Sequence, residues 1–225
     1  MSTQDTQSSE DRRGPDIAGR LRRLRHAMVR EQIIARGITN ARVVRAMARL
    51  PRELFLSDAL MDEAYSDGAL PSMDGQTISQ PYIVALMTDR LRLEPNHRVL
   101  EIGTGTGYQT ALLAMLSKRV CTIEYHAGLA ARARDCLERL NLKNIEYHVG
   151  DGALGWPDGG PFDRIIVSAA TEHPAAPWLS QLRAGGILIA PIGRANDVQT
   201  LTLFRRGGFG FTRHPIIQCR FVPLV

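Results

Sequence analysis

Cysteine is scarce in this sequence, which has only three cysteines, Cys121, Cys136 and Cys219, in 225 residues. They form no C-x-x-C pair and no metal-ligand spacing with the six scattered histidines, so we expect no bound metal. A small, odd number of cysteines is typical of a reducing compartment. Cys121 lies in an apolar stretch, where we expect a small buried side chain.

Long apolar runs are absent too. No stretch reaches the roughly 18 apolar residues of a membrane-spanning helix. Residues 1–19 are polar and lack the apolar centre of a secretory signal, so we expect a disordered tail there. These absences predict a cytoplasmic protein with no membrane partner.

Positive charge is concentrated at one end of the chain. The formal net charge is +5, but residues 1–50 hold 11 Arg against 5 Asp/Glu, whereas residues 51–225 hold 17 Lys/Arg against 18 Asp/Glu. The main body is therefore not basic, and we expect no nucleic-acid partner. The arginines of a helix predicted at 21–36 are interpreted as a solvated face, and phosphate binding by this segment is left open.

The first third of the chain has a helical pattern. Gly37 ends the first helix as a C′ residue, and Pro51 stops a second helix with an apolar face at Val43, Met47 and Leu50. Shorter helical pieces and a turn at 67–68 follow. We expect residues 20–70 to form a helical cap that packs on residues 71–225 as a single compact unit.

The remainder alternates between strands and helices. Loop composition at 71–76 precedes Thr77-Ile78-Ser79-Gln80-Pro81, where Pro81 begins a helix that Ser79 or Gln80 would cap. The alternation predicts an α/β fold with a doubly wound, mostly parallel sheet, and the turn at 207–208 predicts one antiparallel strand near the end. Strands are predicted at 99–102, 120–124, 145–149, 165–168, 187–192, 200–204 and 216–222, and helices at 109–117, 129–140 and 177–182.

Three glycines at alternate positions follow the first of these strands. Gly103, Gly105 and Gly107 stand between the strand and a helix, and Glu101 lies two residues before the first glycine. A strand, a glycine turn and a helix let a ligand approach bare backbone beside the positive end of the helix. This stretch is therefore the predicted ligand site.

Acidic residues end the next two strands. Ligands of open α/β sheets bind beyond the carboxyl ends of the strands, where Glu124 and Gly150-Asp151 lie. The carboxylate of Glu124 is placed to accept hydrogen bonds from ribose hydroxyls. Because the order is G-x-G-x-G, with Tyr108 next, a pyrophosphate has no cradle and a nicotinamide dehydrogenase is disfavoured.

The acid-x-Gly-x-Gly-x-Gly pattern resembles S-adenosylmethionine-dependent methyltransferases, which have a Rossmann-like fold. The resemblance implies that Glu124 binds the ribose and that Asp151 binds the adenine amino group. A closer likeness, over about residues 20–225, is to the protein-L-isoaspartate O-methyltransferases. It rests on residues 77–82, 99–109, 150–152, 162–170, 182–186 and 220–224, and in the cap on 37–38 and 50–53.

This family resemblance implies an enzyme that moves a methyl group from S-adenosyl-L-methionine to the free α-carboxyl of L-isoaspartyl residues in damaged proteins, leaving S-adenosyl-L-homocysteine. The carboxylate is ionised at pH 7 and the sulfonium is an activated donor, so no general base is needed. Holding the two groups in line supplies most of the rate. The absence of a Ser-His-Asp pattern is consistent with this mechanism.

The resemblance also implies the site residues. Ser79 is expected to position the substrate carboxylate as a hydroxyl donor rather than to act as a nucleophile. Val222, Leu224 and Val225 are expected beside an extended substrate held by backbone hydrogen bonds. The expected cofactor contacts are Gln76, Thr77, Ile78, Ser79, Glu101, Gly103, Thr104, Gly105, Thr106, Gly107, Glu124, Tyr125, Gly150 and Asp151.

Two loops depart from the family pattern, at 72–75 and 171–174. Both would flank the substrate entrance, so they bear on substrate preference more than on cofactor binding. A small-molecule carboxyl methyltransferase and a non-catalytic S-adenosylmethionine-binding adaptor stay open as alternatives. We expect a monomer whose partners are isoaspartyl-containing proteins and peptides.

Overall fold

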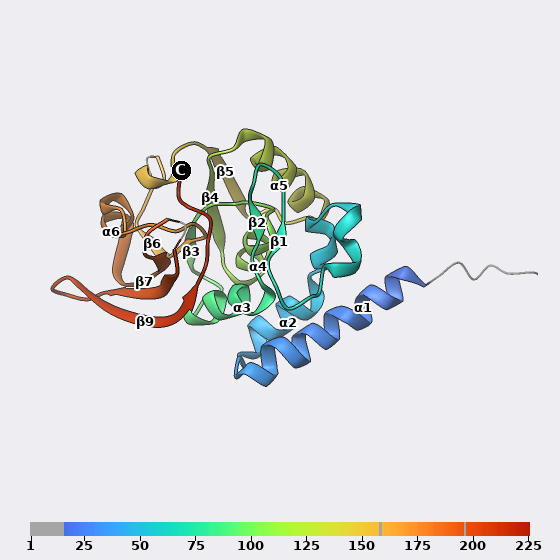
Figure 1. Cartoon of the computed structure of the whole chain (residues 1–225). Helices are drawn as coiled ribbons and strands as arrows, with labels where there is room; N and C mark the ends of the chain where they lie inside the picture. The colour runs from blue at the N-terminus through green and yellow to red at the C-terminus, as the bar shows by residue number, and fades with distance from the viewer. Residues whose placement is uncertain (1–15, 158, 196) are drawn as a thin grey trace, which may run out of the picture.

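A seven-stranded sheet runs through the middle of the molecule, which we describe from a computed structural model covering residues 16–157, 159–195 and 197–225 (Figure 1). The strand order is β5-β4-β3-β6-β7-β8-β9. The first five of these are mutually parallel, and β8 is antiparallel to both of its neighbours. The strands are β3 (Arg98–Ile102), β4 (Arg119–Glu124), β5 (Ile145–Val149), β6 (Phe162–Val167), β7 (Leu182–Ile192), β8 (Gln199–Arg206) and β9 (Phe211–Cys219).

Helices cover both faces of the sheet, as a doubly wound fold requires. Along β3, Val99 joins the core beneath the helices α3, α4 and α5, whereas Leu100 joins the core beneath α6. This alternation follows from the two-residue period of a strand. The predicted α/β fold is therefore confirmed. The helices of this part are α3 (Pro81–Arg90), α4 (Tyr108–Leu116), α5 (Ala127–Arg139), the short 3-10 helix η5 (Gly152–Leu154) and α6 (Ala176–Gln181).

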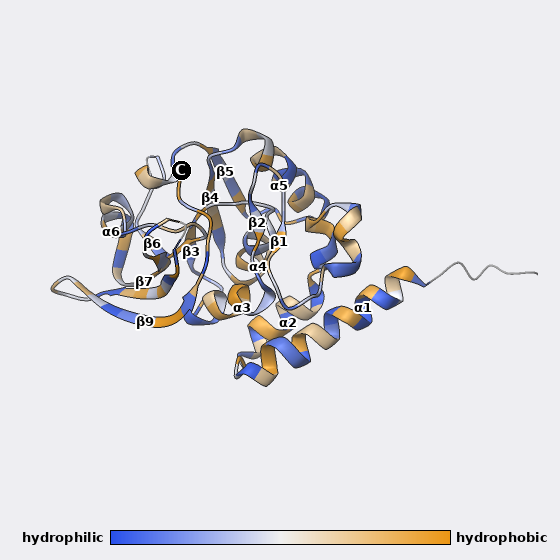
Figure 2. Cartoon of the chain, viewed as in Figure 1, coloured by the Kyte–Doolittle hydropathy of each residue, from blue (hydrophilic) through white to orange (hydrophobic). Residues whose placement is uncertain are grey.

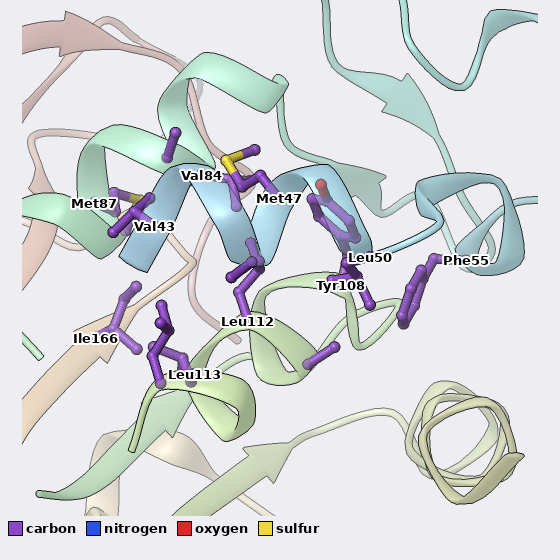
Figure 3. Close-up of a cluster of buried hydrophobic side chains, with 14 of the residues drawn as sticks. Val43, Met47, Leu50, Phe55, Val84, Met87, Tyr108, Leu112, Leu113 and Ile166 are labelled. Atoms are coloured by element: carbon purple, nitrogen blue, oxygen red, sulfur yellow. The ribbon is translucent and has the colours of Figure 1, made fainter. Parts of the chain in front are cut away.

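The N-terminal helices share a core with the sheet. Met47, from the cap, is fully buried against Val84 and Met87 of α3 and Leu112 of α4 (Figure 3). Burying each such side chain contributes about 1.5–3 kcal/mol, so the cap is held by the core of the main domain. Its elements are α1 (Ile17–Met28), the π-helical turn η1 (Val29–Ile33), η2 (Ile34–Arg36), α2 (Ala41–Arg49), η3 (Arg52–Phe55) and η4 (Asp58–Glu63).

Helix α1 alternates between hydrophilic and hydrophobic colours along its length (Figure 2). Leu21 and Met28 are buried, whereas Arg20, Arg22 and Arg23 are exposed. The helix begins at Ile17, inside the range predicted as a disordered tail, because Asp16 caps it by accepting a 2.8 Å hydrogen bond from the Gly19 N–H. The tail prediction is therefore wrong for residues 17–19, and residues 1–15 lie outside the described residues.

Strand boundaries differ from the prediction mainly near the C-terminus. The last strand spans Phe211–Cys219 rather than residues 216–222. It starts five residues early because the tight β8–β9 turn pairs Arg206 with Phe211, and it ends at Cys219. The predicted antiparallel strand is confirmed, and Cys121 is buried in β4 as expected. Among the described residues, no helix has the length and apolar character needed to span a membrane.

Part of the predicted loop at 71–76 is a small hairpin. Strand β1 (Leu70–Pro71) pairs with β2 (Thr77–Ile78), and the Ser72 N–H donates to the Gln76 carbonyl at 2.8 Å. Asp74 and Gly75 both have positive φ, at 54° and 69°, which closes the tight turn. The hairpin ends next to Ser79 and thereby positions it.

Candidate active site

A cavity opens at the carboxyl ends of β3, β4 and β6, where the topology predicts a ligand. The β1–β2 hairpin forms one of its walls, and the C-terminal residues form another. Its lining consists of residues 76–79, 102–106, 108–109, 123–126, 168–169 and 221–225, together with Val84, Met87 and Gly152.

Most of the predicted site residues come together in this cavity. Glu101, Gly107, Gly150 and Asp151 do not line it. The predicted residues that line it are Gln76, Thr77, Ile78, Ser79, Gly103, Thr104, Gly105, Thr106, Glu124, Tyr125, Val222, Leu224 and Val225.

The glycine turn has the backbone that its sequence predicts. Gly103, Gly105 and Gly107 all have positive φ, at 86°, 55° and 90°. A Cβ on Gly105 would meet no atom within 4 Å, whereas a Cβ on Gly107 would come within 3.2 Å of Leu137. Gly105 thus presents bare backbone to the cavity, and Gly107 lets α4 pack closely on α5.

Glu124 is the one acidic side chain in the cavity lining. It is 6% exposed, and its two oxygens accept backbone hydrogen bonds, from Gly105 at 2.8 Å and from His126 at 3.0 Å. Each carboxylate oxygen has a second lone pair, so both can still accept a hydrogen bond from a ligand hydroxyl. The geometry suits a vicinal diol such as a ribose.

Glu101 lies beneath the cavity rather than in it. The side chain is fully buried, and Oε2 accepts hydrogen bonds from the hydroxyls of Thr110 and Thr122. Burial, chiefly, and the nearby charge of Glu124 raise the pKa of this carboxyl to about 8, against the lowering effect of the hydrogen bonds from Thr110 and Thr122. Thr122 in turn lies 2.6 Å from the hydroxyl of Thr104, so Glu101 supports the cavity wall through a chain of hydroxyls.

Ser79 lies between the hairpin and α3. The N-cap of α3 is Gln80, with Pro81 in the first turn and no side-chain capping bond. Within the described part of the chain, the Ser79 hydroxyl has no hydrogen-bond partner, so it does not act as a helix cap. The half-buried side chain lines the cavity and can donate to a ligand.

The C-terminal residues cover the cavity as an extended segment outside the sheet. Ala170 donates a 2.8 Å hydrogen bond to the Val222 carbonyl and accepts a 2.9 Å bond from the Leu224 N–H. These two bonds fix the segment to the loop that follows β6. Val222, Leu224 and Val225 are thereby placed at the cavity, although not by the strand that the sequence predicts.

Gly150 and Asp151 lie beside the cavity. The Gly150 N–H donates to the backbone carbonyl of Glu124 at 3.0 Å. Asp151 is exposed and caps η5, with Oδ1 accepting a 2.8 Å bond from the Ala153 N–H. The sequence thus indicated the correct strand end, but the cavity wall there is the next residue, Gly152.

Sequence reasoning missed several lining residues. Val84 and Met87 of α3 belong to the buried core and also line the cavity. Gln109 is held by Thr88 through a 2.9 Å hydrogen bond. The strand-end rule that selects Glu124 also selects Ser168. The other missed residues are Ile102, Tyr108, Ile123, His126, Gly152, Ala169, Phe221 and Pro223.

The charges of the lining suit a cationic ligand. Among the described residues, no Lys or Arg lines the cavity, and Glu124 supplies a negative charge. A pyrophosphate would have no cation to neutralise it, whereas the carboxylate would attract a sulfonium. The donor set therefore fits S-adenosylmethionine and not a dinucleotide. The described residues contain no group of three or more His, Cys, Asp and Glu side chains suited to a metal ion.

The chain is similar to known proteins over most of its length. A family model described as protein-L-isoaspartate(D-aspartate) O-methyltransferase matches residues 23–225. The protein-L-isoaspartate O-methyltransferase of Trichlorobacter lovleyi is 52% identical over 202 residues, which cover 89% of this chain and 93% of the relative. The Paracoccus denitrificans protein of the same name is 50% identical over 190 residues, covering 84% and 88% of the two chains.

Two solved structures share the fold. One protein-L-isoaspartate O-methyltransferase superposes with a TM-score of 0.80 at 28% identity, covering 90% of this chain and 65% of the other. A Plasmodium falciparum structure described as a putative protein-L-isoaspartate O-methyltransferase, in complex with S-adenosyl-L-homocysteine, gives a TM-score of 0.78 at 23% identity. It covers 89% of this chain and 98% of the other. The second likeness bears on the fold alone.

Proposed function

The chain belongs to the protein-L-isoaspartate(D-aspartate) O-methyltransferase family, and we propose that the cavity beside Ser79 is the site of its methyl transfer. The enzyme moves a methyl group from S-adenosyl-L-methionine to L-isoaspartyl residues of damaged proteins and leaves S-adenosyl-L-homocysteine. The observation that carries the site assignment is that Ser79, the glycine turn, Glu124 and the C-terminal segment line one cavity.

The cofactor assignment rests on Glu124 and the glycine turn. Glu124 would accept hydrogen bonds from the two ribose hydroxyls, and the bare backbone of residues 103–106 would face the amino acid end. Tyr125, which follows Glu124 at the rim and is 54% exposed, would lie beside the adenine. Asp151 is assigned to the adenine amino group from its exposed position beside the cavity.

Three of the predicted cofactor residues are assigned a supporting role. Glu101 stabilises the wall through Thr122 and Thr104, and Gly107 allows the close packing of α4 on α5. Gly150, bonded to the backbone of Glu124, would hold the end of β5 next to it. These residues would act on the cofactor through their neighbours.

The mechanism needs little from the protein beyond positioning. When bound, S-adenosylmethionine supplies a methyl group already activated by the sulfonium. The Ser79 hydroxyl would donate a hydrogen bond to one substrate oxygen and orient the carboxylate, which is already ionised at pH 7. The C-terminal segment would cover the cavity and exclude water from it. No residue has to remove a proton.

The substrate is assigned an extended backbone along residues 222–225. The segment already exchanges backbone hydrogen bonds with Ala170, so its remaining polar groups are oriented for an approaching chain. The loops at 72–75 and 171–174 flank this region and would tune substrate preference. The family match does not favour a small-molecule methyltransferase or a non-catalytic adaptor. A monomeric state and a cytoplasmic location stay predictions.

Methyl transfer to a matched pair of peptides tests the proposal. An isoaspartyl peptide and its normal aspartyl twin are incubated with S-adenosylmethionine carrying a labelled methyl group. We expect labelling of the isoaspartyl peptide only, and equal labelling of both would contradict the substrate assignment.

Ser79→Ala tests the site itself. We expect kcat to fall by about 10- to 100-fold, because one charge-assisted hydrogen bond is lost, while the Kd for S-adenosylhomocysteine stays within about twofold. Ser66→Ala, at an exposed serine outside the cavity lining, is the matched control. Loss of cofactor binding in Ser79→Ala would instead place Ser79 in the cofactor site.

A further inference from the structure

A second hollow lies at the opposite end of the sheet from the active-site cavity. Four basic residues, Arg90, Arg92, Arg205 and His214, line it, and we refer to it as the basic groove. Its remaining lining is apolar and consists of Ile187, Leu203, Pro215 and Ile216. Because α3 starts next to Ser79 and ends at Arg90, the groove and the active site lie at the two ends of one helix.

Three separate parts of the fold bring these cations together. Arg90 ends α3, Arg92 follows it, and Arg205 and His214 come from β8 and β9. Leu203, Arg205 and His214 share one face of the hairpin, since Leu203 pairs with His214 and side chains alternate along each strand. A solvated basic face of a single helix would draw its residues from that helix alone. The basic residues of the groove come from different elements, so the tertiary structure brings them together.

In the part of the chain that the structure describes, no acidic residue lines the groove. The guanidinium groups of Arg90, Arg92 and Arg205 have no hydrogen bond or ion pair with any described residue. Arginines elsewhere on the surface do pair, as Arg36 does with Asp67 and Arg134 with Glu138. Asp89 and Glu94 line an adjoining hollow with Arg90 and Arg92 but form no ion pair with them in the described chain.

The surroundings add positive charge and strain. Arg164 lies beneath the groove and donates to the carbonyls of Leu91 and Arg92. Burial, chiefly, and the charges of Arg183 and Arg205 lower the pKa of Arg164, against an opposing effect of Asp163. Arg92 has a φ of 49°, in the left-handed region that a residue with a side chain rarely adopts.

We propose that the basic groove binds a phosphate group. The planar fork of an arginine donates two parallel hydrogen bonds to a phosphate, and three arginines can surround its oxygens. Ile187 is buried and Leu203 and Ile216 are half-buried, so they form an apolar floor beside the exposed cations. Either free phosphate or a phosphate monoester presents the required dianion. The site is independent of methyl transfer, so its test needs neither cofactor nor peptide.

Isothermal titration of the full chain with inorganic phosphate tests the site, at constant ionic strength maintained with chloride. We expect saturable binding that weakens at least about tenfold in the double variant Arg92→Gln/Arg205→Gln, which removes two bidentate donors. Arg205→Lys keeps the charge without the fork and should bind with intermediate affinity. The matched control is Arg213→Gln, because Arg213 pairs with Phe204 and lies on the other face of the same hairpin.

Glycerol 3-phosphate, titrated in parallel, distinguishes the two sources of the phosphate group. Tighter binding than inorganic phosphate supports a monoester, and equal or weaker binding supports free phosphate. Two results would overturn the proposal: no saturable binding of either phosphate compound, or equal binding by the groove variant and Arg213→Gln. Thermal unfolding of each variant confirms that the side chains, and not the fold, cause the loss.

Discussion

The backbone N–H of Gly105 donates a 2.8 Å hydrogen bond to Oε2 of Glu124. The two residues belong to separate motifs of the sequence, each interpreted there as a contact for the ligand. In the folded chain they also contact each other, so the carboxylate holds the glycine turn in place beside the cavity. In the proposed site, one residue would thus serve in both preorganisation and binding.

Replacing this carboxylate should weaken cofactor binding strongly. In Glu124→Gln we expect the Kd for S-adenosylhomocysteine to rise about 10- to 100-fold, because the hydrogen bonds to the ligand lose their charge assistance. Isothermal titration measures the affinity, and Glu138→Gln, at an exposed carboxylate of α5, is the control. An unchanged Kd would remove Glu124 from the ribose site.

The second predicted acid should matter less. Asp151→Asn is expected to raise the same Kd by less than about fivefold, because its exposed position lets water screen any hydrogen bond that it makes. The amide retains an oxygen for the cap of η5. A loss as large as that of Glu124→Gln would show that Asp151 turns into the site when the cofactor binds.

Two glycines of one turn should separate stability from binding. In Gly107→Ala the new Cβ would crowd Leu137 and Ala133 at a φ of 90°, so we expect a loss of about 2–4 kcal/mol in unfolding free energy. In Gly105→Ala the Cβ has free space, and the strain is only about 1–2 kcal/mol. Because Gly105 faces the cavity, its variant should instead lose more cofactor affinity. Urea unfolding measures the stability, and titration with S-adenosylhomocysteine measures the affinity. A larger stability loss in Gly105→Ala, or a larger affinity loss in Gly107→Ala, would contradict the prediction.

Glu101 should make stability depend on pH. Its pKa is about 8 in the folded chain against an ordinary 4.5, so between these values the folded protein keeps a proton that the unfolded chain releases. The unfolding free energy should therefore fall as pH rises through this range, by up to about 5 kcal/mol from this group. Glu101→Gln stays neutral and should lose less stability between pH 5 and pH 8.5, roughly the range spanned by the two pKa values. Urea unfolding at a series of pH values measures the unfolding free energy of the unchanged protein and of Glu101→Gln. The same pH dependence in both proteins would exclude Glu101 as its source.

Shortening the chain at its C-terminus should affect the substrate more than the cofactor. Deletion of residues 223–225 removes the bond from the Leu224 N–H to Ala170 and leaves the extended segment without its second anchor. We expect the KM for an isoaspartyl peptide to rise at least about fivefold, the effect of losing one to two hydrogen bonds. The Kd for S-adenosylhomocysteine should change by less. The reverse order would assign this segment to the cofactor.

Most of the secondary structure was predictable because strong local signals coincide. Pro81 begins α3 and Gly37 follows the first helical segment, as each residue's backbone preferences require. Boundaries failed where a particular hydrogen bond or strand pairing, and not the apolar pattern, decides them. Asp16 starts α1 before the apolar pattern begins, and the pairing of Arg206 with Phe211 moves β9 five residues toward the N-terminus.

By itself the sequence determined the fold class, the family and the ligand-binding turn, because periodicity, glycine spacing and strand-end acids are local properties of the chain. Only the tertiary structure decided which predicted residues line the cavity. Glu101 and Glu124 are both acids of motifs, yet the pleat and burial of their strands place one beneath the cavity and the other in its wall. The basic groove is likewise invisible in the sequence, since Arg92 and Arg205 are brought together by packing across the sheet.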